Sequence, residues 1–213
     1  MTPLLIVFAR APVAGQCKTR LIPALGPEGA AWAQERLLHQ TLATAAAWRA
    51  ATPGAVIELH CAPDAVHPVF VACADQYQVT LVAQRAGDLG ARMWLALMTA
   101  LGAGARPVLI GTDCPDRTVD HLREAFAKLD AHDAVFGPAT DGGYVLVGLA
   151  RAVPELFAGI TWSTSRVMPE TRERARRAGA RLAELAPLAD VDTPADWTRL
   201  VRDPRYAQLT GVV

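Results

Sequence analysis

Short apolar runs alternate with longer segments of helical periodicity along this chain, and that alternation limits the possible folds most strongly. Apolar runs of this kind are typical of strands covered on both faces in a parallel sheet. We expect strands over residues 4–9, 56–61, 79–83, 108–111, 134–137, 144–148 and 182–185. We expect helices over 27–51, 64–76 (interrupted by Pro68), 89–102, 118–129 and 164–178, and a last helix that begins at Pro194 with Thr193 as its N-cap. The pattern predicts an α/β fold with a mostly parallel sheet, as a single domain over residues 1–213.

Composition narrows the class of protein. Hydrophobic residues make up 52% of the 213, which suits a globular core. The 21 basic and 21 acidic residues balance, which disfavours nucleic acid as a partner but allows a small basic pocket. No apolar stretch approaches the roughly 18 residues of a membrane span, and residues 1–10 lack the basic start of a signal peptide. The four cysteines show no C-x-x-C spacing, so we expect a reduced, cytoplasmic protein with no membrane partner.

One expected strand is followed by a pair of carboxylates. After the run 108–111 come Thr112, Asp113, Cys114, Pro115 and Asp116. Ligands of open α/β sheets bind just beyond the carboxyl ends of the strands. An Asp there, with a second acidic residue three positions on, could hold Mg²⁺ for the phosphates of a nucleotide. Asp and Pro are also ordinary turn residues, so a plain turn remains the alternative.

A basic loop follows the first expected strand. It carries Arg10, Lys18 and Arg20, and Lys18 is one of only two lysines in a chain that has 19 arginines. Lys-Thr after a strand invites a P-loop interpretation, which fails because Pro12 and Cys17 stand where that motif requires glycine. Three cations and backbone N–H groups can still wrap a diphosphate or triphosphate. A solvated basic loop is the alternative.

Another acidic segment precedes the last expected helix. In the run Asp-Val-Asp-Thr-Pro, Asp190 and Asp192 stand just before the helix N-terminus. Either could complete a cation site with Asp113, because Mg²⁺ usually takes one or two carboxylates beside phosphate oxygens and water. The alternative is a helix cap, which favours the same residue types.

Two glycine-containing segments offer further binding sites. Gly142-Gly143 beside Asp141 permits positive φ and close backbone approach to a ligand, and it also suits a hairpin turn. Gln84 and the segment 87–92 could contact a base or ribose, although a plain helix-start loop accounts for them equally well.

Other reactions have little support. The two serines, Ser163 and Ser165, lie in no G-x-S-x-G motif, and Cys114 has no assigned base. The five histidines do not cluster as zinc ligands do. No G-x-G-x-x-G follows the first expected strand, which weakens a dinucleotide-cofactor interpretation.

Six segments share their order and residues with one known family. They are 8–15 with 18–21, 87–90, 111–115, 137–138 with 141–144, 162–164 and 190–194. By these segments the chain resembles the DUF2064 family, glycosyltransferase-like proteins sometimes linked to arsenosugar biosynthesis, in the nucleotide-diphospho-sugar transferase superfamily. The resemblance covers residues 4 to about 200. It implies a GT-A-like, Rossmann-type three-layer αβα sandwich.

The same resemblance implies roles for individual residues. Asp113, Lys18 and Arg20 would be catalytic, with the two cations on phosphates and Asp113 binding Mg²⁺ or Mn²⁺ beside Asp192. The nucleotide site would comprise Ala9, Arg10, Gly15, Lys18, Arg20, Gln84, Gly87, Leu89 and Gly90. The acceptor site would comprise Asp141, Gly142, Gly143, Tyr144 and Trp162. Arg10 stands where many relatives have Lys, so the point-charge contact of an ammonium with a phosphate would become a bidentate contact of a planar guanidinium.

Two reactions fit this set. A glycosyltransferase would bind a nucleotide sugar, and the cation would neutralise the departing diphosphate. A guanylyltransferase-like nucleotidyltransferase would bind an NTP, whose α-phosphorus an acceptor phosphate or carboxylate attacks with release of pyrophosphate. The family resemblance favours sugar transfer. A non-catalytic nucleotide-binding protein is a third interpretation. The partners implied are a nucleotide or nucleotide sugar and a small-molecule acceptor.

Overall fold

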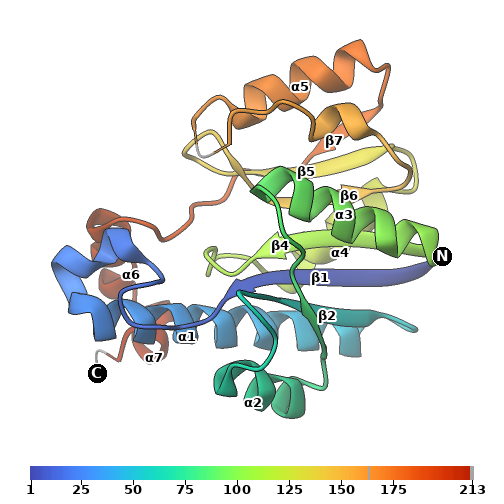
Figure 1. Ribbon diagram of the computed structural model, residues 1–213. Helices are drawn as coiled ribbons and strands as arrows, with labels where there is room; N and C mark the ends of the chain where they lie inside the picture. Colours follow the sequence, from blue (N-terminus) through green and yellow to red (C-terminus); the bar gives the residue numbers. More distant parts are fainter. Residues whose placement is uncertain (163, 212–213) are drawn as a thin grey trace.

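The computed structural model describes residues 1–162 and 164–211; Ser163, from one of the six segments, lies outside them. The described residues form one seven-stranded sheet in the order β3-β2-β1-β4-β6-β5-β7, with helices on both faces (Figure 1). The strands are β1 (Thr2–Arg10), β2 (Val56–Ala62), β3 (Thr80–Ala83), β4 (Ala105–Gly111), β5 (Ala134–Pro138), β6 (Tyr144–Leu149) and β7 (Leu182–Glu184). The α-helices are α1 (Ile22–Ala50), α2 (Pro68–Tyr77), α3 (Leu89–Gly102), α4 (Val119–Lys128), α5 (Val167–Arg177), α6 (Pro194–Arg202) and α7 (Ala207–Thr210). The predicted three-layer α/β architecture is confirmed.

β6 is the reversed strand of the sheet. It pairs antiparallel with β4 and β5, whereas β1 pairs parallel with β2 and β4. The turn between β5 and β6 is the predicted hairpin turn: Gly142 has φ 94°, and Asp141 Oδ1 accepts the N–H of Gly143 at 2.8 Å. Because β6 runs opposite to β4 and β5, it begins at the edge of the sheet where those two strands end. Tyr144 therefore lies at the same edge as the end of β4.

Side chains of β1 alternate between two apolar layers. Leu5 and Val7 pack in a cluster with residues of α1, α2 and α4, whereas Leu4 and Ile6 pack in another with residues of α3 and α5. All four side chains are buried. A strand covered on both faces is what its continuous apolar run predicts.

Three helices begin three or more residues away from the position expected. α1 begins at Ile22, because one turn precedes Gly26, whose φ of 69° bends the chain ahead of Pro27. α2 begins at Pro68 instead of running through it, since proline lacks an N–H and suits the first turn of a helix. α5 begins at Val167 rather than at residue 164.

The C-terminal segment returns to the first helix. α6 begins at Pro194 with Thr193 as its N-cap, as predicted. Residues of α6, α7 and the two 3-10 turns η1 (Thr19–Leu21) and η3 (Pro204–Tyr206) pack on α1 in a third apolar cluster that includes Leu21, Val191 and Trp197. Figure 1 shows this red segment beside the blue start of α1. Within the described residues, no helix has both the length and the apolar character of a membrane span.

Candidate functional site

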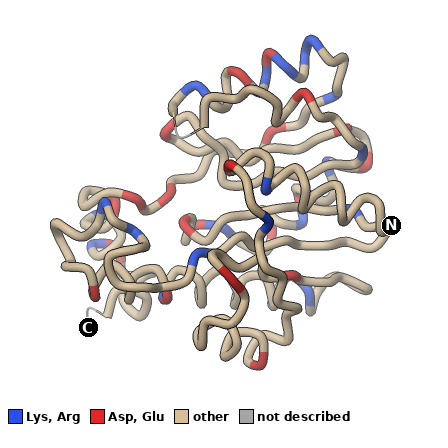
Figure 2. The backbone as a smooth tube through the Cα atoms, viewed as in Figure 1, with Lys and Arg blue, Asp and Glu red and all other residues tan. Residues whose placement is uncertain are grey.

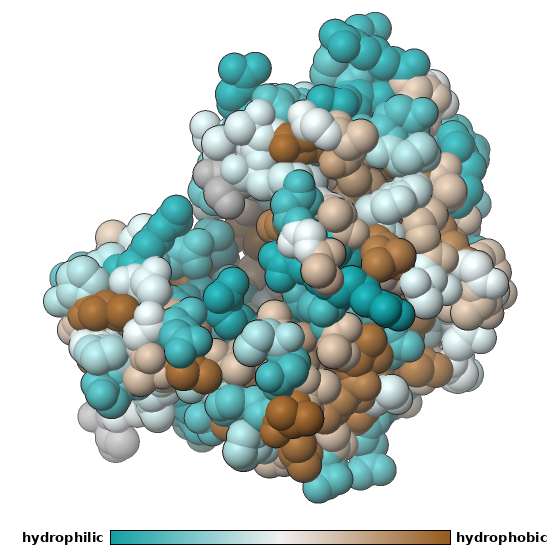
Figure 3. Space-filling model, in the orientation of Figure 1, coloured by the Kyte–Doolittle hydropathy of each residue, from teal (hydrophilic) through white to brown (hydrophobic). Residues whose placement is uncertain are grey.

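A cleft of about 480 Å³ opens at the edge of the sheet where β1, β2 and β4 end. Its walls come from the end of β1 and the loop after it, the starts of α3 and β6, and the segment before α6. The surface is hollowed between the α1–α6 end and the α5 end of the molecule (Figure 3). Acidic and basic positions both occur on the segments around this edge (Figure 2). This is the edge at which open α/β sheets bind ligands.

Lys18 connects three of the predicted site segments. Its Nζ forms an ion pair with Asp113 Oδ1 at 2.8 Å, and it donates hydrogen bonds to Asp192 Oδ1 at 2.9 Å and to the carbonyl oxygen of Val191 at 2.6 Å. Arg20 Nη1 lies 3.7 Å from Asp192 Oδ2. The structure thus brings Asp113, Lys18, Arg20 and Asp192 together, although 174 positions separate Lys18 from Asp192.

The Lys18 side chain is only 5% exposed, yet it remains an ammonium ion. Burial lowers its pKa, but the carboxylates of Asp113 and Asp192 outweigh that effect, and the net pKa is raised. The backbone of Lys18 is left-handed, with φ 45° and ψ 40°, which is uncommon for a residue with a side chain. η1 follows directly, and Leu21 N–H donates to the Lys18 carbonyl at 2.8 Å.

Asp113 is held by the backbone of the C-terminal segment. Val191 N–H donates to the Asp113 carbonyl at 2.8 Å, and Thr112 Oγ1 donates to Asp113 Oδ1 at 3.3 Å. The Asp113 side chain is 43% exposed, so it faces both Lys18 and solvent. Asp116, the second carboxylate of that loop, accepts a hydrogen bond from the Tyr206 hydroxyl instead. The carboxylate that meets Asp113 at Lys18 is Asp192.

Arg117 braces the same edge and was not predicted as a site residue. It is buried, and its Nη1 and Nη2 donate to the carbonyl oxygens of Gly111 and Val145, each at 2.9 Å. Burial lowers the pKa of its guanidinium. These bonds join the end of β4 to the start of β6, and so fix the spacing between Asp113 and Tyr144. A buried cation with carbonyl partners leaves no signal in the sequence.

Gln84 and Arg92 form one wall of the cleft. The Gln84 amide donates to the carbonyl oxygens of Ala9 and His60 at 3.2 and 2.8 Å, and its oxygen accepts from Arg92 Nη1 at 2.9 Å. Gln84 thus connects β1, β2 and α3 by hydrogen bonds. Arg92 belongs to the segment expected to contact a nucleotide, but it was not among the predicted site residues.

The predicted nucleotide residues divide into two groups. Among the described residues, those that line the 480 Å³ cleft are Ala9, Arg10, Lys18, Arg20, Gln84 and Leu89. The three predicted glycines, Gly15, Gly87 and Gly90, are not part of its lining. Gly15 and Gly87 have positive φ, 76° and 126°, and shape the turns. Gly90 lies directly beneath the Trp162 indole, where a Cβ would come within 2.6 Å of Nε1.

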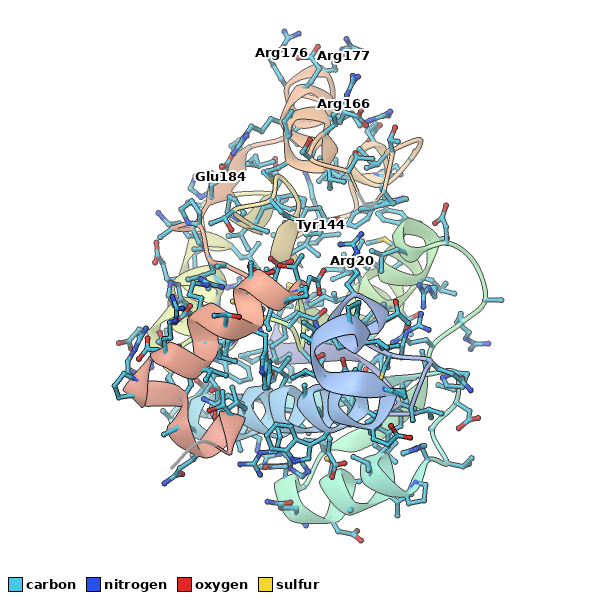
Figure 4. All side chains as sticks on the ribbon, turned by 90° about the vertical axis from the view of Figure 1, so that its left-hand side faces the viewer. Arg20, Tyr144, Arg166, Arg176, Arg177 and Glu184 are labelled. Atoms are coloured by element: carbon cyan, nitrogen blue, oxygen red, sulfur yellow. The ribbon has the colours of Figure 1, made fainter. Side chains whose placement is uncertain are left out.

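A second cleft of about 250 Å³ adjoins the first. It is lined by four of the predicted acceptor residues, Asp141, Gly143, Tyr144 and Trp162. The two clefts share Arg20, Leu89, Met93, Tyr144 and Asp192. Figure 4 shows Arg20 and Tyr144 near each other in the end-on view. Gly142 lies against the Ser165 backbone, where a Cβ would be 2.7 Å from Ser165 Cα.

Negative charge accumulates beside the second cleft. Burial, reinforced by Asp141 and Asp192, raises the pKa of Asp190 to about 6. Asp141 lies in the lining of the second cleft, and its Oδ1 accepts the Gly143 N–H. Cys114 is buried and burial raises its pKa, so its thiol is a poor nucleophile. Within residues 1–162 and 164–211, no group of three or more His, Cys, Asp or Glu side chains is arranged to hold a metal by itself.

The fold is that of the nucleotide-diphospho-sugar transferase class. A crystal structure from Desulfovibrio desulfuricans G20, described as a candidate nucleotide-diphospho-sugar transferase, matches with a TM-score of 0.84 and 30% identity, over 98% of this chain and 91% of that one. The model of a family described as "Uncharacterized protein conserved in bacteria (DUF2064)" matches residues 35–164. The chain belongs to the DUF2064 family, as the six segments indicated, and by family and fold it is a transferase.

More distant structures share the fold alone. Rv0371c from Mycobacterium tuberculosis, in complex with manganese, has a TM-score of 0.56 and 21% identity, over 95% of this chain and 100% of that one. A nucleotidyl transferase from Methanothermobacter has a TM-score of 0.59 and 13% identity, over 94% of this chain and 96% of that one. None of the curated proteins matches the sequence.

Proposed function

We propose that the chain is a metal-dependent glycosyltransferase, a single GT-A-like domain that uses a nucleotide-sugar donor. The observation that carries the proposal is the meeting of Lys18, Asp113 and Asp192 at the mouth of a cleft at the carboxyl edge of the sheet. Such a site unites cationic groups for phosphates with carboxylates for a divalent ion. The four cysteines are free thiols, which agrees with a cytoplasmic location.

The charge of the first cleft suits a diphosphate. Four cations line it, Arg10, Lys18, Arg20 and Arg92, against two carboxylates, Asp113 and Asp192, an excess of two positive charges. Arginine forks and a lysine point charge bind phosphate oxygens in complementary ways. We assign this cleft to the donor nucleotide.

The residues fit a hard divalent cation. The Asp113 and Asp192 carboxylates and the Val191 carbonyl direct three oxygens at one point, the position of Lys18 Nζ. Mg²⁺ and Mn²⁺ prefer oxygen ligands, usually one or two carboxylates together with phosphate oxygens and water. Asp113 and Asp192 would hold the ion, which when bound would neutralise charge on the leaving diphosphate. Lys18 and Arg20 would stabilise the same developing charge.

The second cleft suits an acceptor hydroxyl better than an anion. Its charged lining is Arg20, Asp141 and Asp192, and Arg20 already pairs with Asp192. Asp141 therefore leaves the cleft negative, which would repel an acceptor phosphate or carboxylate. The Trp162 and Tyr144 rings provide apolar surface on which the C–H face of a sugar can pack. This distribution favours transfer of a sugar to a neutral, hydroxyl-bearing acceptor.

Nucleotidyl transfer is the second candidate. The Methanothermobacter nucleotidyl transferase shares the fold, and the same lysine and carboxylates would serve an NTP. Its acceptor would have to approach beside Asp141, so this reaction fits the second cleft less well.

A product assay tests the proposal. The purified protein with Mg²⁺ or Mn²⁺ is incubated with a panel of nucleotide sugars and NTPs, each with neutral polyols and with sugar phosphates. We expect nucleoside diphosphate release from a nucleotide sugar, enhanced by a polyol. Pyrophosphate release from an NTP would establish nucleotidyl transfer instead, and tight binding without turnover would establish a non-catalytic nucleotide-binding protein.

A further inference from the structure

We propose that the Lys18 ammonium occupies the position in which the divalent ion would bind, so that the ion and Lys18 compete for one set of oxygens. The inference rests on the proposed function for the identity of the ion. It adds a second role for Lys18: the side chain keeps the metal site closed until phosphates give the ammonium another partner. The consequence is that metal and phosphate ligand bind together, while metal alone binds weakly.

The Lys18 ammonium makes three close contacts with oxygen, two of them hydrogen bonds and the third an ion pair. An ammonium has three N–H donors, and Nζ has three oxygen partners, on Asp113, Val191 and Asp192, between 2.6 and 2.9 Å away. The side chain is almost completely buried, so this is a built site and not a chance contact on the surface. A cation already stands where the oxygens converge.

The oxygens that hold Lys18 are the ligands that a hard cation selects. Both acidic partners and the carbonyl come from segments far from Lys18 in the sequence, and they converge on one point. Without a cation there, the Asp113 and Asp192 carboxylates would repel each other. Two cations cannot share that point, so a divalent ion that uses these oxygens must displace the ammonium.

The displaced ammonium has a place to go. Lys18 lines the first cleft, beside Arg10 and Arg20, where the donor phosphates would bind. Its four-carbon stem is flexible, which allows the head group to move without movement of the backbone. The left-handed backbone of Lys18 lies directly before η1, and Lys18 lines the first cleft together with Asp113 and Asp192.

Substitution Lys18→Met tests the inference, because it removes the charge and keeps the length of the stem. Binding of Mn²⁺ alone is measured by electron paramagnetic resonance of the free ion. We expect Mn²⁺ to bind Lys18→Met about tenfold more tightly or better than the wild type, since the two carboxylates lose the ammonium that contacts both of them. Inorganic pyrophosphate without metal should bind Lys18→Met more weakly than the wild type.

Controls separate this inference from a general effect. Lys128→Met removes an α4 lysine that is 39% exposed and pairs with Glu124, and it should change neither affinity. Lys18→Gln should repeat the result of Lys18→Met if that variant folds poorly, and Lys18→Arg, which keeps the charge, should not tighten Mn²⁺ binding. Adding Asp113→Asn to Lys18→Met should abolish the increase in Mn²⁺ affinity.

Two results would overturn the inference: Mn²⁺ affinity that is unchanged or lower in Lys18→Met, or a gain that survives Asp113→Asn. Neither readout depends on turnover. If the Mn²⁺ result holds while the product assay finds no sugar transfer, the proposed function fails and the competition stands. If sugar is transferred but the Mn²⁺ affinity does not rise, only the competition is wrong.

Discussion

Asp113 combines two tasks in one residue. Its backbone carbonyl anchors Val191, while its carboxylate contacts Lys18 and remains 43% exposed. The hydrogen bond from Val191 N–H to the Asp113 carbonyl does not involve the side chain, so a substitution of the carboxylate can change the charge of the site while this bond is kept.

Asp113→Asn should therefore abolish Mg²⁺-dependent nucleotide binding and leave the fold intact. An amide keeps the shape of the side chain but loses the charge that a divalent ion requires. Calorimetric titration with nucleotide and Mg²⁺ measures the loss, and the melting temperature measures the fold. Asp130→Asn, at a carboxylate that pairs with Arg106 away from the cleft, is the matched control. Unchanged Mg²⁺-dependent binding in Asp113→Asn would remove Asp113 from the site.

Gly90 sets the position of the Trp162 ring. A Cβ at Gly90 would overlap the indole, so Gly90→Ala should displace Trp162 from the wall of the second cleft. Overpacking of this kind costs about 1–3 kcal/mol. Gly102→Ala, at the other end of α3 with open space around it, should be neutral or stabilising. Near-ultraviolet circular dichroism measures the change in the environment of the Trp162 ring. An unaltered spectrum together with unaltered stability in Gly90→Ala would show that Gly90 does not set the position of that ring.

At the scale of elements, Asp133 joins the ends of three strands. It precedes β5, accepts the Arg181 N–H just before β7 at 2.9 Å, and accepts from Arg151 Nη2 just after β6 at 3.2 Å. The Arg181 backbone bond first, and then the Arg151 guanidinium, hold the pKa of this carboxyl far below its usual range. The carboxyl side chain is 11% exposed, so the bonds are sheltered from water.

A pKa lowered by folding means that the folded state binds fewer protons than the unfolded state. The stabilisation is therefore complete above the ordinary pKa of an aspartate and is lost as the pH falls below about 4. Asp133→Asn should cost about 2 kcal/mol near neutral pH and progressively less in acid. Urea denaturation across that range measures the difference. Asp120→Asn, at an 85% exposed carboxylate on α4, should change little, and a cost that is independent of pH would refute the argument.

For the whole molecule, the apolar runs predicted every strand of the sheet and the helices between them, because burial on both faces dictates the composition of such strands. The sequence also indicated Asp113 and Asp192, the two carboxylates that meet at Lys18, but not the Val191 carbonyl. It could not show that they meet, since no local pattern spans the distance from Lys18 to Asp192. That contact depends on the packing of the C-terminal segment on α1, and Arg117 escaped prediction because its partners are backbone carbonyls.

Trp197 links the C-terminal segment to the rest of the molecule. It is buried and packs edge-on against Trp32 of α1 at 6.1 Å. Trp197→Ala removes about 3–5 kcal/mol of packing, so α6 and α7 should lose protection from hydrogen exchange while β1 and β4 keep theirs. Mn²⁺-dependent nucleotide affinity should fall with them. Trp94→Ala, which alters the apolar cluster on the other face of the sheet, should change neither the protection of α6 and α7 nor the nucleotide affinity. A loss of protection in Trp197→Ala that is equal in all elements would contradict this view.

The carbonyl and carboxylate supplied by Val191 and Asp192 follow the last strand of the sheet, which ends at Glu184. During synthesis, every described strand of the sheet is therefore made before the two residues that complete the contacts of Lys18. A chain that stops after Glu184 would therefore contain every described strand but lack the Val191 carbonyl and the Asp192 carboxylate that contact Lys18.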